Sequence, residues 1–119
     1  MARELNIGMK RFTKIIVTDE PGPGGACHQY EIIPVEGERT APYCLVKFQK
    51  GPVKENGVNG ISNEDLLAIV IDRLEGFQKG EFACIENEIA LHQLRSALAM
   101  LNFRTKERIK RGVEGTSQK

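Results

Sequence analysis

The feature of this sequence that most constrains its fold is a long helix-forming segment in the second half. From about Ala83 to Arg111 the chain contains neither glycine nor proline, and Gly112 then offers a natural helix end. At about 1.5 Å per residue this helix would be about 40 Å long. Leucines stand at 91, 94, 98 and 101, and this 3-4-3 spacing predicts a seam that packs against another helix.

A shorter helix is predicted before it, from Ser62 to about Phe77. Ser62 is followed by Asn-Glu-Asp, which is typical of a helix start with a capping box. Its apolar residues fall on two sides, so both sides need to be covered. Because the long helix extends beyond this one, we expect part of the leucine seam to face another subunit, in a homo-oligomer.

The first half of the chain has the pattern of a β-sheet. Gly and Pro residues at 21–25 and 50–60 predict loops, and residues 1–10 are expected to be a loose arm. Pro34 is expected at a strand end or on an edge. Strands rich in β-branched and aromatic residues are predicted at 12–18, 28–35 and 43–49. The sequence therefore predicts an α+β fold, with a small N-terminal antiparallel sheet packed on a C-terminal helical hairpin.

Length and charge limit the organisation and the partners. The 119 residues suit a single domain over 1–119, with a β-rich half at about 12–50, a helical hairpin at about 62–111 and a tail at 112–119. The net charge of +1 argues against a general nucleic-acid coat. No apolar leader is seen, and the longest apolar run, 66–71, is too short to span a membrane. We therefore expect a cytoplasmic protein without membrane contact.

The sequence indicates neither a catalytic nor a metal site. His28 and His92 are not accompanied by a nucleophile and an acid that would make a catalytic set. The PGPGG run lacks the Lys-Ser/Thr of a phosphate-binding loop, and the three cysteines are widely spaced. We therefore expect a protein that is not an enzyme and has no cofactor.

Arginines at the end of the long helix are candidates for ligand binding. Arg104, Arg108 and Arg111 are spaced at i, i+4 and i+7, so they share one helix face. One guanidinium group can bind two phosphate oxygens at once, and it can also stack on a base. The alternative is a solvated basic helix end that the helix dipole stabilises.

Two further candidates lie near the turn between the helices. Phe77, beside the cation of Lys79, is suited to stack on a base, or instead it seals the end of the hairpin core. Asn87 lies on the register of the leucine seam, four residues before Leu91. Its amide can pair with an adenine edge, but an asparagine at such a position can also set helix register in an oligomer. The pattern leaves both readings open.

The second half of the chain also resembles a known family. The runs GPVKENGVNGISNEDLLAIVIDRL, GFQKGEFACIENEIALHQLRSAL and RTKERIKRGVEGT are similar to those of phage anti-defence sponges. These are the Thoeris anti-defence proteins of type one and the related anti-CBASS proteins, which share a helical-hairpin domain. The resemblance covers residues 51–116. The predicted strands favour the anti-Thoeris branch, because the anti-CBASS branch is mostly helical.

The resemblance implies a function that spacing alone does not reveal. It implies a non-catalytic protein that sequesters immune nucleotide second messengers in the cytoplasm of an infected bacterium. The messengers would be cyclic ADP-ribose isomers, with cyclic di- or trinucleotides at a separate site in some members, and the assemblies would range from dimer to hexamer. The resemblance carries ligand binding to Phe77, Lys79, Asn87 and Arg104, and Arg108 and Arg111 are expected to add charge.

Two alternatives remain at this point. One is a small nucleic-acid-binding protein that uses the Arg104–Arg111 face, although the nearly neutral net charge does not favour a polymeric nucleic acid. The other is an enzyme that hydrolyses the nucleotide, although no base, nucleophile or metal site is evident.

Overall fold

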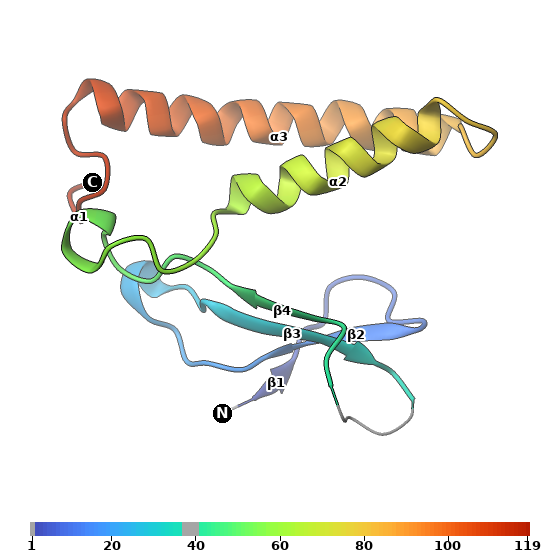
Figure 1. The fold of residues 1–119 in the computed structure, drawn as a ribbon, viewed down its shortest axis with the longest axis horizontal. Coiled ribbons are helices and arrows are strands. Elements are labelled where there is room, and N and C mark those ends of the chain that lie inside the picture. The colour runs from blue at the N-terminus through green and yellow to red at the C-terminus, as the bar shows by residue number, and fades with distance from the viewer. Residues whose placement is uncertain (1, 37–40) are drawn as a thin grey trace. The chain divides into compact units, whose positions relative to one another are not determined.

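A computed structural model describes residues 2–36 and 41–119 (Figure 1). It has an antiparallel sheet and a pair of long helices, which confirms the α+β fold class. The chain forms two compact units, Met1–Ile61 and Ser62–Lys119. The single domain, the packing of the sheet on the hairpin and the homo-oligomer stay predictions. In the described part of the chain, no helix is long and apolar enough to cross a membrane.

The first unit is built on a sheet whose four described strands have the order β1-β2-β3-β4. Each strand pairs with the next in antiparallel fashion. The three expected strands are confirmed, and Pro34 is the last residue of its strand. The strands are β1 Arg3–Glu4, β2 Thr13–Val17, β3 Gln29–Pro34 and β4 Cys44–Lys47.

The expectation of a loose arm over residues 1–10 is wrong. Arg3 and Glu4 pair with Val17 and Ile16 and form β1. The two residues have no strand pattern of their own. Their pairing depends on the edge of β2, which offers unpaired backbone groups to any nearby segment.

Two loops of this unit have more structure than their composition indicates. The loop at 21–25 contains a 3-10 helix, η1, at Pro23–Gly25, and the loop at 50–60 contains a one-turn helix, α1, at Val53–Asn56. The second loop ends where Gly60 passes close to the backbone of Phe48, and any side chain at 60 would collide there. The buried apolar residues of this unit are Ile16, Val17, Cys27, Ile33 and Val46.

The second unit is a hairpin of α2, Asn63–Gln78, and α3, Ile85–Lys110, drawn in yellow and orange in Figure 1. The predicted capping box is confirmed, because Asp65 N donates to Ser62 Oγ at 3.2 Å and Ser62 N donates to Asp65 Oδ2 at 2.9 Å. These two bonds satisfy backbone and side-chain groups that would otherwise be left free at the helix start.

Helix α3 ends where the sequence predicts. Gly112 has a positive φ of 76°, which a glycine adopts without strain. Gly112 N donates to Ile109 O and Val113 N donates to Arg108 O, each at 3.0 Å. This pair of bonds is a Schellman motif, which satisfies the last carbonyls of the helix and turns the chain back.

The leucine seam forms the inward face of α3, which confirms that it packs against another helix; the expectation that part of it faces another subunit stays a prediction. Leu91 is only 2% exposed, and the other three seam leucines are half-buried. The same alternating spacing of three and four continues through Thr105, which is half-buried, to Arg108, which is buried. Helix α2 places Ile71 in the hairpin core.

Candidate functional site

Phe77 lies in the last turn of α2 and is held there by two aromatic contacts. The guanidinium carbon of Arg73 lies 4.9 Å from the centre of the Phe77 ring. The ring of Phe82 meets Phe77 edge to face, with 6.5 Å between ring centres. Phe77 remains half-buried rather than fully enclosed. The ring is therefore oriented by its neighbours and still accessible, which suits a stacking platform.

Lys79 caps the C-terminal end of α2 and is exposed. It lines a pocket of about 300 Å³ on the hairpin, which Phe77 and Asn87 do not line. In this pocket Arg95 Nη2 and Glu75 Oε2 form an ion pair of 2.7 Å. Gln78 closes the turn, because its Nε2 donates to Cys84 O at 3.1 Å and its Oε1 accepts from Cys84 N at 3.0 Å.

Asn87 lies in the first turn of α3 and on the inward register of the seam, and it is half-buried. Within the residues that the structure describes, its side-chain amide makes no hydrogen bond. Helix packing therefore does not occupy its donor and acceptor groups. Both predicted roles, recognition of a base edge and control of helix register, are compatible with this position.

The three predicted arginines line one pocket of about 470 Å³ at the other end of α3. Arg104 and Arg111 are exposed there, and the exposed side chains of Met100 and Phe103 form its apolar wall. Sequence reasoning missed these apolar residues as part of the site. The sequence contained this signal, because Met100 stands one turn before Arg104 and Phe103 stands about two turns before Arg111 on the same helix.

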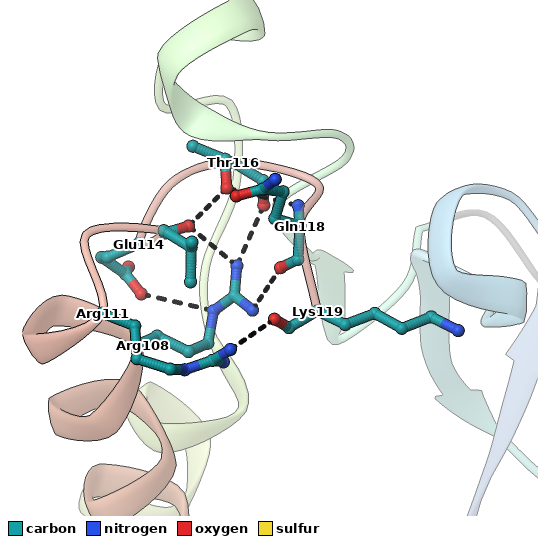
Figure 2. Close-up of polar contacts among 7 residues, drawn as sticks. Arg108, Arg111, Glu114, Thr116, Gln118 and Lys119 are labelled. Carbon is teal, nitrogen blue, oxygen red and sulfur yellow. Dashed lines mark hydrogen bonds and ion pairs between the residues drawn. The ribbon is translucent and has the colours of Figure 1, made fainter.

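Arg108 differs from its two neighbours because it turns inward. It is 8% exposed, and its guanidinium donates to Gln118 O at 2.6 Å and to Val113 O and Thr116 O at 3.0 Å (Figure 2). Its Nε lies 3.8 Å from Glu114 Oε2. Arg108 thus holds the tail against the end of α3, and its predicted role in ligand binding stays a prediction.

The structure places the predicted residues in two groups that lie far apart along the hairpin. Phe77, Lys79 and Asn87 belong to the turn end, and Arg104 and Arg111 belong to the opposite end. At about 1.5 Å per residue, Asn87 and Arg104 are about 25 Å apart along the axis of α3. A single small nucleotide therefore cannot contact both groups of one chain.

The histidines and cysteines do not form a metal site in the described part of the chain. Residues 2–36 and 41–119 contain no group of three or more His, Cys, Asp or Glu side chains that could hold a metal ion. His92 is exposed on α3 and His28 is buried in the first unit.

Two comparisons with known proteins bear on the hairpin. A family model described as Acb2/Tad1, hairpin domain, matches residues 41–105. A protein of Bacillus phage SBSphiJ7 named Thoeris anti-defense 1 is 58% identical over 74 residues, which are 62% of this chain and 52% of that protein. The match thus spans about half the length of this relative. The family resemblance seen in the sequence is confirmed, and the matched region contains Phe77, Lys79, Asn87 and Arg104.

Proposed function

Because this chain belongs to the Acb2/Tad1 hairpin-domain family, we propose that it is a non-catalytic sponge for nucleotide second messengers. It binds a messenger of a bacterial anti-phage system and holds it intact, so the system is not activated. The relative named Thoeris anti-defense 1 supports opposition to Thoeris defence. The messenger is a cyclic ADP-ribose isomer, with cyclic di- or trinucleotides of CBASS systems as further ligands, and the protein acts in the host cytoplasm.

The observation that carries this proposal is the division of the candidate residues between the two ends of the hairpin. The turn end offers a ring, a cation and a free amide, which suit a base and its phosphate. The other end offers two exposed guanidinium groups, which suit a pyrophosphate. Since about 25 Å separates Asn87 from Arg104 along α3, the complete site requires two copies of the chain.

An antiparallel pairing of α3 with α3 of a second copy brings the two half-sites together. The centre of this pairing would lie midway between Asn87 and Arg104, near Ser96, and small residues there allow close approach of two helices. An exposed stripe of α3 runs through this point and is apolar on both sides of it. The stripe comprises Ile85, Ile89, His92, Ser96, Met100 and Phe103. An unpartnered apolar stripe of this kind supports a homo-oligomer built from antiparallel dimers.

Each residue has its own role in the composite site. Phe77 stacks on adenine, and Asn87 pairs with the edge of the base. Lys79 of the same chain and Arg104 of the second chain neutralise the pyrophosphate, and the exposed Arg111 adds charge. Arg108 supports this pocket from beneath, because its N–H groups already donate to the carbonyls of the tail.

Tight binding is required of a sponge, since it competes with a cellular receptor for the messenger. A nanomolar site corresponds to about −12 kcal/mol. The contacts that orient Phe77 reduce the ordering that binding requires. Native mass spectrometry with a cyclic ADP-ribose isomer tests the proposal. The expected result is an even-numbered oligomer that gains the ligand mass and, after heating, releases the nucleotide unchanged. A monomer that binds as tightly, or a released product of altered mass, contradicts it.

The nucleic-acid alternative has less support from the arginine end. Arg108 is turned inward, and Glu107 lines the same pocket as Arg104 and Arg111. The face therefore offers fewer free cations than the sequence indicated. Steep salt dependence and binding to polymers without preference for a small nucleotide would favour this alternative over the sponge.

A further inference from the structure

A pocket of about 250 Å³ lies wholly within the first unit, where β3 begins and β4 ends. It shares no residue with the proposed messenger site. Cationic, aromatic and amide side chains all line it. Its lining includes Asp19, His28, Lys47, Phe48, Lys50 and Asn59.

His28 has a buried nitrogen that the fold leaves without a partner. The residue is 9% exposed, and within the described residues its Nδ1 atom is buried and has no hydrogen-bond partner. Such a group lowers stability unless a ligand or a water molecule supplies its hydrogen bond. The backbone of His28 is fixed on both sides, because His28 N donates to Asp19 Oδ2 at 2.9 Å and Phe48 N donates to His28 O at 2.8 Å. The imidazole is therefore held in place at the pocket.

Lys50 brings positive charge to the pocket that His28 lines. A Cβ atom placed on Gly22 would lie 3.5 Å from both His28 Nδ1 and Lys50 Cε, so the imidazole and the lysine stem both border Gly22. The backbone of Lys50 is held by Asn59, which accepts from Lys50 N at 2.8 Å and donates to Lys50 O at 2.9 Å. Lys47 at the end of β4 lines the same pocket.

Asp19 only partly cancels this charge. Its carboxylate accepts hydrogen bonds from His28 N at 2.9 Å and from Gln29 N at 3.0 Å. Burial acts to raise the pKa of Asp19, but these two backbone hydrogen bonds and the charges of His28 and Lys50 bring the pKa below its ordinary value. The ionised carboxylate offsets one of the two lysines, so the pocket keeps an excess of positive charge.

We propose that this pocket binds the phosphate group of a small ligand, with the ammonium groups of Lys47 and Lys50 as donors beside the imidazole of His28. Lysine binds phosphate as a point charge. A volume of about 250 Å³ is below the range of pockets for drug-sized ligands. It therefore suits free phosphate or the phosphate of a mononucleotide, and Phe48 offers apolar surface to a nucleoside.

The test follows the imidazole nitrogens of the full-length chain by NMR during titration with inorganic phosphate and, separately, with adenosine 5′-monophosphate. We expect a saturable shift of His28 Nδ1, whereas the nitrogens of His92 on α3 stay unchanged. Tighter binding of the nucleotide assigns the site to a mononucleotide, and equal affinity assigns it to free phosphate.

Two lysine variants make the test specific. Lys50→Gln should weaken binding by about tenfold or more, since it removes one charged donor. The variant should keep its fold, because the hydrogen bonds between residue 50 and Asn59 involve only the backbone of residue 50. Lys54→Gln is the matched control, an exposed lysine of the same unit that does not line the pocket.

Three results bear directly on the proposal. No saturable shift at His28 with either probe overturns it, and an equal loss of binding in the two lysine variants also overturns it, since that result indicates non-specific attraction. The variant Arg104→Ala separates this site from the messenger site. It should weaken messenger binding roughly ten- to a hundredfold and leave the phosphate-dependent shift at His28 unchanged.

Discussion

Mixing two variants that each bind the messenger weakly should restore tight binding if the site is shared between two chains. Asn87→Ala damages the turn end of the hairpin, and Arg104→Ala damages the opposite end, about 25 Å away along α3. In a two-fold dimer, each site takes Asn87 from one chain and Arg104 from the other. A dimer of one chain of each variant therefore has one site with both residues intact and one site with neither.

The size of the effect follows from this geometry. Loss of the Arg104 hydrogen bonds to a charged phosphate should cost about 1.5–3 kcal/mol, which is roughly ten- to a hundredfold in affinity. Loss of the Asn87 pairing should cost about 1–3 kcal/mol. Random mixing of equal amounts yields about half mixed dimers, so about a quarter of all sites should recover the affinity of the unmodified protein.

The assay is isothermal titration calorimetry with a cyclic ADP-ribose isomer, after the two variants have been unfolded and refolded together. Native mass spectrometry would verify that mixed oligomers have formed. Phe77→Ala mixed with Asn87→Ala is the control, because both changes damage the same end and no site is repaired. Verified mixed oligomers without recovered tight sites, or equal recovery in the control, would refute the shared site.

Three further outcomes concern stability. Arg108→Met should lower the free energy of unfolding by about 2–4 kcal/mol, since three tail carbonyls lose a charged donor; urea unfolding measures this, and an equal loss in Arg111→Met would contradict it. Ser62→Ala removes a helix cap and should cost about 1 kcal/mol, whereas Ser117→Ala should change little. Because the pKa of Asp19 is lowered in the folded state, its contribution is present above its ordinary pKa and is lost as pH falls through the lowered value. Urea unfolding of Asp19→Asn should therefore show a weaker loss of stability in acid, and an unchanged pH profile would count against this.

Local rules account for the parts of the fold that the sequence predicts well. The capping box at Ser62, the helix end at Gly112 and the spacing of the seam leucines depend on residues within one or two helical turns of each other. Such patterns are visible without knowledge of the rest of the chain. Strands β2, β3 and β4 were predicted for the same reason, since runs of β-branched and aromatic residues are separated there by runs of turn-forming residues.

The candidate site was predicted residue by residue, but its geometry was not. The sequence places Phe77, Asn87 and Arg104 on the hairpin, and the family resemblance gives them a shared role. Neither reveals that one chain holds them at the two ends of the hairpin, with about 25 Å between Asn87 and Arg104 along α3. That result follows from the length of α3 as one unbroken helix, which keeps its two ends apart.

By itself, the sequence determined the class of fold, the bounds of the two long helices and the family, because these depend on local spacing and extended similarity. Only the tertiary structure decided the positions and contacts of Arg3, Arg108 and His28. Arg3 joins the sheet because β2 offers an open edge. Arg108 turns inward because the chain folds back past Gly112 and presents carbonyls to it. His28 keeps a buried nitrogen without a partner, within the described residues, in a place where Asp19 and Phe48 fix its backbone. In each case the deciding partner lies outside the helix or strand that carries or borders the residue, so the pattern of that element does not reveal it.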